Sequence, residues 1–217
     1  MLKALVIKEL RESAGVVALA LIAMIVVCAE LHGIDEIGTP RFLEIRDRFP
    51  FVSDDFFSRF ALVIFPLAAV LGIKQSAWEL GQNSYQFLLH RPVQRSFVFN
   101  TKIIVGCGLV FVIGGLAIVA YALRVAIPGS SPTPFLWSMT ADEWQIVLCA
   151  LVVYLGAFLS GIRPAHWFGT RLAPVMTAGG AAFVFSFLSG WLAFIASALV
   201  AALYLAGIFY YANDRDY

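Results

Sequence analysis

Charged residues are scarce in this sequence of 217 residues: they make up 13% of it, whereas hydrophobic residues make up 61%. In a typical soluble domain about a quarter of the residues are charged. The composition therefore excludes an ordinary soluble domain and indicates an integral membrane protein. The formal net charge is +1, so the sequence has no basic excess of the kind that attracts nucleic acid. We expect the lipid bilayer to be the main surroundings of the chain.

Motifs for nucleotide and metal binding are also missing. The dipeptide Gly-Lys never occurs, so the chain has no P-loop with which to bind and hydrolyse a nucleotide. No HExxH motif is present, and the histidines fall on three different predicted loops or helix ends, so we expect no metal site. The cysteines all lie inside apolar runs and are interpreted as small buried hydrophobic residues. These two sets are His32, His90 and His166, and Cys28, Cys107 and Cys149.

An intramembrane enzyme is not expected. The tetrapeptide FLSG occurs at 158–161 and 187–190 and matches half of an intramembrane serine-protease motif, but the preceding glycine is missing in both copies. Such an enzyme needs polar residues that converge at one depth, and the apolar runs offer only scattered Ser, Tyr and Thr. The chain is therefore predicted to have no catalytic residues.

Six apolar runs are close to the roughly 20 residues that a helix needs to cross the hydrocarbon core. They cover 14–31, 57–75, 103–127, 144–162, 172–189 and 191–211. The last two are separate spans only if the sequence SGW at 189–191 forms a tight turn or if one run is re-entrant, so five spans is the alternative. We predict an all-α integral membrane protein with six transmembrane helices.

The basic residues predict the orientation of these spans. If the N-terminus is cytoplasmic, the inner segments carry twice as many Lys and Arg residues as the outer segments. The positive-inside rule then places both termini in the cytoplasm. The acidic segment 32–58 becomes an outer loop, which we interpret as solvated rather than cation-binding. The expected location is a cell membrane, as a multi-pass protein of a bacterial inner membrane.

Residues 1–13 are amphipathic, whereas the spans are mostly apolar. Leu2, Leu5, Val6 and Leu10 recur at helical spacing, with charged residues around the rest of the turn. This pattern is typical of an amphipathic helix that lies along the membrane interface. The segment also holds two glutamates, and no A-x-A-like cleavage site follows the first apolar run, so we expect it to be retained rather than cleaved. The domain prediction is an elbow helix at 1–13 and a transmembrane domain at 14–217.

Charges within the spans are expected only near their ends, at Glu30 and Arg124. A carrier driven by protons or ions usually needs an intramembrane carboxylate or histidine. The energy for any transport is therefore expected to come from elsewhere.

Local signals also predict helix boundaries and bends. The sequence TADE at 140–143 predicts a capping box, in which the Thr140 hydroxyl accepts a hydrogen bond from an amide one turn further on and Glu143 reaches back. Pro66 and Pro174 are expected to kink their helices.

The segment WELGQNSYQFLLHRPVQRSF, at 78–97, is the longest polar stretch between two spans. It predicts a short cytoplasmic helix interrupted near Arg91, because a residue before proline disfavours the helical region. One edge of this helix is apolar and consists of Trp78, Tyr85, Leu88 and Leu89. Such an edge can dock into a groove of a protein partner or lie on lipid, and the residues alone leave both open.

The same segment, extended to WELGQNSYQFLLHRPVQRSFVFNTKIIVG, resembles the first cytoplasmic loop of ABC-2-type transporter permeases. In that family an acidic residue and Gly precede a Leu-Leu pair, a Pro-Val-x-Arg turn and a lysine that opens the third span. The matching positions are Glu79, Gly81, Leu88, Leu89, Pro92, Val93, Arg95 and Lys102. The opening IKELRES, at 7–13, is similar to the N-terminal elbow helix of the family. One departure is that SGW leaves little room for the re-entrant helical pair that the family usually places between its fifth and sixth spans.

The resemblance implies the membrane subunit of an ATP-binding-cassette exporter, with a coupling loop at 76–102. A separate ATPase subunit would bind ATP and Mg²⁺, this chain would bind no cofactor, and a second permease chain, identical or related, would complete the transporter. The docking contact is expected from Trp78, Tyr85, Leu88 and Leu89, with Glu79, Arg91 and Arg95 setting its polar register. The alternative is a non-transporting scaffold or immunity protein that uses this segment to recruit a soluble partner.

Overall fold

The computed structural model describes residues 2–31, 34–35, 39–40, 51, 56–78, 95–127, 134–163, 170–188 and 190–214. This part of the chain is almost entirely helical. The helices are α1 (Leu2–Leu31), α2 (Phe56–Ile73), η2 (Lys74–Trp78, a π-helical turn), α5 (Arg95–Val125), η3 (Trp137–Thr140, a 3₁₀ turn), α6 (Ala141–Ile162), α7 (Ala173–Ser186) and α8 (Trp191–Asp214). Two short antiparallel strands, β1 (Ile34–Asp35) and β2 (Thr39–Pro40), pair with each other between α1 and α2.

Five of the described helices are long and apolar enough to cross a membrane. They begin and end at Leu2–Ala29, Phe56–Ala77, Phe97–Val125, Trp137–Ile162 and Trp191–Ala212. Apolar runs of this length form helices in lipid because a helix satisfies every backbone polar group within itself. The prediction of an all-α membrane protein is confirmed at this level, and six spans with cytoplasmic termini stay a prediction.

The fifth predicted span, 172–189, corresponds to α7, which is shorter than expected. It has 14 residues and so rises about 21 Å, whereas the hydrocarbon core is about 30 Å thick. The chain then turns at Gly190, whose φ of +75° lies in the left-handed region that favours glycine. The tight turn predicted between 189 and 191 therefore falls at Gly190, and α8 follows at once.

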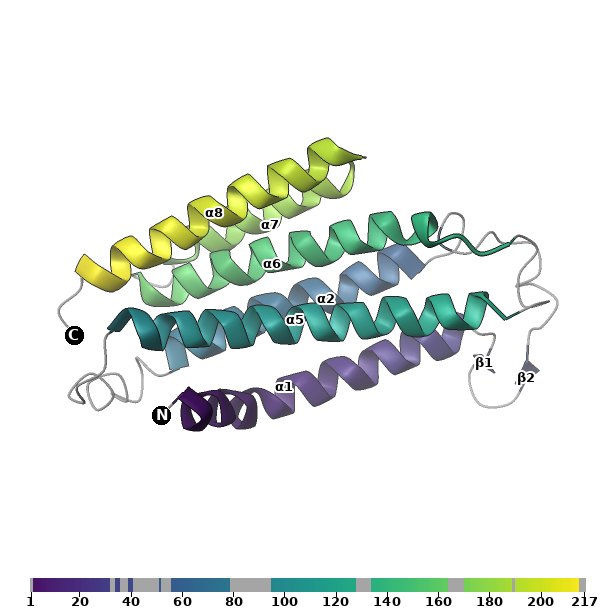
Figure 1. Cartoon of the computed structure of the whole chain (residues 1–217), viewed down its shortest axis with the longest axis horizontal. Coiled ribbons are helices and arrows are strands. Elements are labelled where there is room, and N and C mark those ends of the chain that lie inside the picture. The colour runs from purple at the N-terminus through teal and green to yellow at the C-terminus, as the bar shows by residue number, and fades with distance from the viewer. Residues whose placement is uncertain are drawn as a thin grey trace.

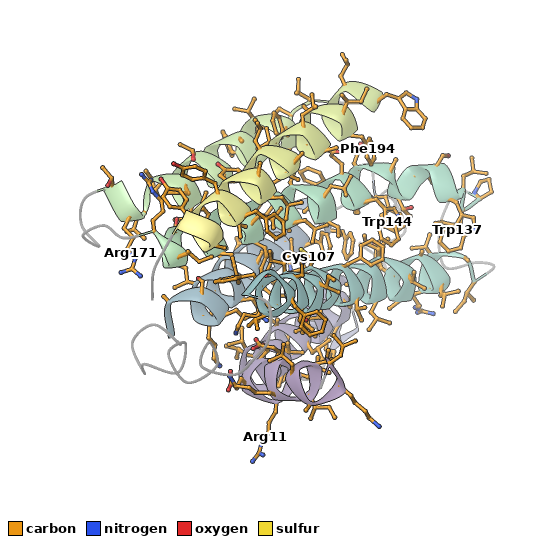
Figure 2. All side chains as sticks on the ribbon, turned by 60° about the vertical axis from the view of Figure 1, so that its left-hand side comes forward. Arg11, Cys107, Trp137, Trp144, Arg171 and Phe194 are labelled. Atoms are coloured by element: carbon orange, nitrogen blue, oxygen red, sulfur yellow. The ribbon has the colours of Figure 1, made fainter. Side chains whose placement is uncertain are left out.

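Helix α6 forms the centre of the bundle. In its most apolar stretch 89% of the residues are buried, against 17% in α8, and it packs against α2, α5, α7 and α8. The core around it is rich in aromatic rings, with Phe56 stacked on both Phe60 and Tyr121. The outer helices expose large apolar side chains, for example Leu19, Leu116 and Leu203, and Figure 2 shows side chains projecting outward from these helices. Such surfaces fit a hydrocarbon environment.

Both chain ends lie at the same end of the bundle, which we call the terminal end (Figure 1). α1 and α5 begin there, and η2, α6 and α8 end there. The described basic residues at this end are Lys3, Lys8, Arg11, Lys74, Arg95, Lys102, Arg163 and Arg171, and those at the opposite end are Arg59 and Arg124. In Figure 2, Arg171 and Trp137 mark the two ends.

Helix α1 runs without interruption through the boundary that we predicted between an elbow and a first span. Its first turns are seen nearly end-on in Figure 1, whereas the rest lies along the bundle, so its axis changes direction. An elbow at 1–13 that lies on the membrane surface stays a prediction.

Two local predictions were wrong. Thr140 does precede α6, but its hydroxyl makes no capping bond and instead donates to the Trp137 carbonyl at 2.9 Å, because η3 offers an acceptor one turn back. Pro174 does not kink a helix: it lies in the first turn of α7, where the missing N–H of proline costs no hydrogen bond. Pro66 lies inside α2, and the kink expected there stays a prediction.

Candidate functional site

The predicted partner-binding residues lie mostly outside the described part of the chain. These are Glu79, Gly81, Tyr85, Leu88, Leu89, Arg91, Pro92 and Val93. Trp78 ends η2, and Arg95 begins α5. The structure therefore describes the two elements that flank the predicted segment, and both flanking points lie at the terminal end (Figure 1).

A buried ion pair lies beside these flanking points. The ammonium Nζ of Lys102, on α5, donates to Oε1 of Glu9, on α1, at 2.6 Å. The side chain of Lys102 is 0% exposed and that of Glu9 is 1% exposed. Moving one charge from water into such surroundings costs several kcal/mol or more, so each residue can be buried here only because the other is present. The pair fixes the first turns of α1 against α5.

Two further polar side chains extend this pair into η2 and α6. The Lys102 ammonium also lies 3.5 Å from the backbone carbonyl of Gln75. The Tyr154 hydroxyl donates to Oε1 of Gln75 at 2.6 Å and lies 3.3 Å from the carbonyl oxygen of Lys102. We call Glu9, Gln75, Lys102 and Tyr154 the terminal network. It joins α1, η2, α5 and α6 through buried side chains.

Glycines allow these elements to approach closely. A Cβ atom at Gly106 of α5 would collide with the Tyr154 hydroxyl, and one at Gly161 of α6 would collide with Oγ of Ser76. At Gly72 of α2, a Cβ atom would lie 2.5 Å from the Tyr154 carbonyl oxygen. Small residues commonly permit close helix packing in membranes, and here they bring the polar groups of the terminal network within hydrogen-bonding distance.

The π-helical turn η2 makes a second contact with α1. The ammonium Nζ of Lys74 donates to the carbonyl oxygen of Glu12 at 2.7 Å. Lys8 and Glu12, one turn apart on α1, form an exposed ion pair at 3.7 Å. The first turns of α1 are thus held by one buried lysine from α5 and one lysine from η2.

A different polar cluster connects α6 with α8. Nε2 of Gln145 donates to Oγ of Ser197 at 2.9 Å and lies 3.6 Å from Sγ of Cys149. The Ser197 hydroxyl in turn donates to the Ala193 carbonyl at 2.8 Å. We call Gln145, Cys149 and Ser197 the neutral cluster, because a buried amide, thiol and hydroxyl hold the two helices without an ion pair.

Side chains satisfy backbone groups at the end of α6 and at the start of α7. The Arg171 guanidinium donates from Nε to the Ser160 carbonyl at 3.2 Å and from one terminal nitrogen to the Gly161 carbonyl at 2.7 Å. A cation at a helix C-terminus also interacts favourably with the helix dipole. The Ser160 hydroxyl accepts from the backbone N–H of Val175 at 3.0 Å, which caps the start of α7.

The two charged members of the terminal network follow from helical spacing, although we did not predict their burial. Glu9 lies four residues after Leu5 and three after Val6, so it falls on the apolar stripe of its helix. Lys102 lies four residues after Val98 and four before Gly106, both of which are buried. Glu9 and Lys102 were expected outside the spans, but two candidate spans begin earlier than predicted and include them near their first turns.

The terminal network holds a buried charge pair beside neutral hydrogen-bonding groups. An ionisable residue inside a membrane domain is costly and usually functional. Among the described residues, no group of three or more His, Cys, Asp and Glu is placed to hold a metal ion. No family model, no characterised protein and no solved structure matches the chain.

Proposed function

We propose that the chain is the membrane-spanning subunit of an ABC exporter, and that it couples ATP hydrolysis by a separate ATPase subunit to the movement of a substrate. The single observation that carries this proposal is the terminal network. It ties both elements that flank residues 79–94 to α1 and to the central helix α6. A force applied to that segment would reach three spans through buried polar contacts.

The polar segment itself supplies the second support. Its sequence is similar to the coupling loop of ABC-2-type permeases, and basic residues gather at the end of the bundle where its flanks lie. By the positive-inside rule that end faces the cytoplasm, where an ATPase would be found. In this proposal Trp78, Tyr85, Leu88 and Leu89 dock into the ATPase, and ATP and Mg²⁺ bind only to that partner.

The proposal also assigns α7, α8 and a second permease chain. α7 and α8 would serve as the fifth and sixth spans, joined by the turn at Gly190. A second permease chain, identical or related, would complete the pathway in a bacterial inner membrane.

The test is co-purification with the ATPase encoded beside this chain. The tagged chain is expressed with that ATPase in mild detergent, as wild type and as the triple variant Glu79→Ala, Leu88→Ala and Arg91→Ala. The control triple variant, Arg124→Ala, Leu136→Ala and Asp142→Ala, removes the same kinds of side chain from exposed positions at the opposite end. We expect wild type and the control to retain the ATPase and the first variant to lose it.

Two results contradict the proposal. If the wild-type chain retains no ATPase, the permease function is wrong. If the ATPase is retained but its hydrolysis does not respond to the wild-type chain in lipid, the segment recruits a partner without coupling to it, and the chain is a scaffold.

A further inference from the structure

The turn η2 departs from the α-helix that leads into it. α2 ends at Ile73, and the chain continues as a π-helical turn over Lys74–Trp78. A π-helix bonds residue i to i+5 rather than to i+4, is rare, and occurs mostly as single turns, often at functional sites. This turn overlaps the beginning of the predicted coupling loop, 76–102.

A serine hydroxyl bonds to the preceding turn at the point where the register changes. Oγ of Ser76 donates to the Gly72 carbonyl at 2.6 Å and lies 3.3 Å from the Ile73 carbonyl. In an uninterrupted α-helix these two carbonyls would accept from the backbone amides of residues 76 and 77. A serine that bonds back to the preceding turn competes with those amides and bends the helix. In η2 the Ser76 hydroxyl thus occupies carbonyls that the α register would use, whereas the same kind of bond from Ser197 to the Ala193 carbonyl leaves α8 in the α register.

The residues of η2 contact three helices at once. Lys74 bonds to the Glu12 carbonyl of α1, the Gln75 carbonyl lies near the Lys102 ammonium of α5, and the Gln75 side chain accepts from Tyr154 of α6. Any change of register in η2 must therefore remake contacts with all three.

The Gln75 side chain is only half satisfied in the π register. Its Nε2 is buried and has no hydrogen-bond partner among the residues that the structure describes. A buried donor without an acceptor costs about 1–3 kcal/mol. A second register that moves this amide can therefore lie close to the first in free energy.

We propose that η2 is a conformational joint that alternates between a π register and an α register. In the α register, backbone amides replace the Ser76 hydroxyl at the Gly72 and Ile73 carbonyls. The residues after the turn then rotate by about 100° around the helix axis, the contribution of one residue. Because Lys102 and Tyr154 are hydrogen-bonded to Gln75, a movement of Gln75 also shifts these side chains and so affects α5 and α6. This inference concerns the chain alone and does not depend on the ATPase.

One peptide bond reports directly on the joint. Ala77–Trp78 is the only Ala-Trp pair in the sequence, so ¹³C-carbonyl alanine with ¹⁵N-tryptophan selects this bond in an NMR spectrum of the full chain in nanodiscs. We expect two resonances, or one with an exchange contribution to its relaxation. Ser76→Ala should cause loss of the π-register resonance. The control Ser186→Ala, which removes a hydroxyl bonded to the Phe183 carbonyl at 2.7 Å, should leave the wild-type pattern unchanged.

A sharp single resonance without exchange in the wild type would overturn the proposal, whatever the Ser76→Ala variant shows.

The melting temperatures of two deletion variants provide a second test of the proposal. Removing Ala77 should convert η2 into an α turn and leave the melting temperature near that of wild type. Removing Ala69 from the middle of α2 shifts every following residue by about 100° and should lower the melting temperature strongly. An equal decrease in melting temperature for both deletion variants would also contradict the proposal.

Discussion

The terminal network and the neutral cluster solve the same problem in different ways. Both place polar side chains between helices in apolar surroundings, and both are almost fully buried. The terminal network uses an ion pair and joins four elements, whereas the neutral cluster uses an amide, a thiol and a hydroxyl and joins two helices. A neutral group that loses its partner leaves an unsatisfied hydrogen bond, but a charged group leaves an uncompensated charge. Separation of the helices is therefore penalised far more at the terminal end than between α6 and α8.

The largest expected effect comes from removing one charge of the terminal network. Lys102→Met leaves the Glu9 carboxylate buried without its cation, and breaking a buried pair in this way costs about 3–5 kcal/mol. We expect the free energy of unfolding in detergent micelles to fall by about that amount. Circular dichroism during denaturant unfolding measures it.

The matched control removes both charges. Replacement of a buried ion pair by apolar residues of similar volume is often neutral or stabilising, so Glu9→Leu with Lys102→Met should recover most of the lost stability. If Lys102→Met is as stable as the double variant, an unpaired Glu9 carboxylate costs no more free energy than an unsatisfied group of the neutral cluster. If the double variant is stable but no longer couples to its partner, the charges serve function rather than folding.

A smaller loss is expected from crowding the same network without changing its charge. In Gly106→Ala the new methyl group meets the Tyr154 hydroxyl and, at 2.5 Å, Oε1 of Gln75. Overpacking of this kind costs about 1–3 kcal/mol. Thermal unfolding of the purified chain measures the loss.

Gly108→Ala is the control for that substitution. It lies two residues further along the same helix, where nothing lies within 4 Å of a new Cβ atom. Alanine favours a helix over glycine by about 0.5–1 kcal/mol, so this variant should be slightly stabilised. Equal melting temperatures for the two variants would mean that α5 and α6 are not in the close contact that brings Tyr154 to Gln75.

The helices could be predicted from the sequence far better than the contacts between them. The runs 57–75 and 191–211 agree closely with α2 and α8, because in lipid the backbone must satisfy its own hydrogen bonds and an apolar run of this length has little choice but to form a helix. The length of α7 was overestimated because Phe187 and Leu188 are apolar but lie beyond its last residue, Ser186, and hydropathy does not separate a helix from apolar residues that follow it.

The buried ion pair could not be predicted from one sequence. Glu9 and Lys102 are 93 residues apart, and the positive-inside rule counts each lysine as if it faced water. Helical spacing agrees with the burial of both residues in the structure, but it carries no information on which two helix faces meet. That depends on the packing of α1 against α5. The close contact of Gly106 with Tyr154 and the hydrogen bond from Lys74 to the Glu12 carbonyl help to determine this packing.

The neutral cluster should respond more weakly than either change in the terminal network. In Ser197→Ala, Nε2 of Gln145 loses its acceptor at 2.9 Å but keeps the Cys149 sulfur at 3.6 Å. Interhelical hydrogen bonds in membrane proteins contribute about 0.6 kcal/mol on average and at most about 1.7. We expect a loss of about 1 kcal/mol or less in denaturant unfolding, and a loss as large as that of Lys102→Met would remove the distinction between the two clusters.

The smallest effect is expected at the exposed contact between α7 and α8. The hydroxyls of Thr177 and Tyr204 lie 2.9 Å apart, and Tyr204→Phe removes this bond together with one to the Pro174 carbonyl at 3.2 Å. Thr177 keeps its own bonds to the Ala173 and Pro174 carbonyls, so no buried group is left unsatisfied, and the loss should be about 0.5 kcal/mol. The comparison is thermal unfolding of Tyr210→Phe, which changes an exposed tyrosine less than two turns further along α8. If Tyr204→Phe instead costs as much as Gly106→Ala, the packing of the short helix α7 against α8 depends on this hydroxyl, and the order that places the neutral cluster above this exposed contact is wrong.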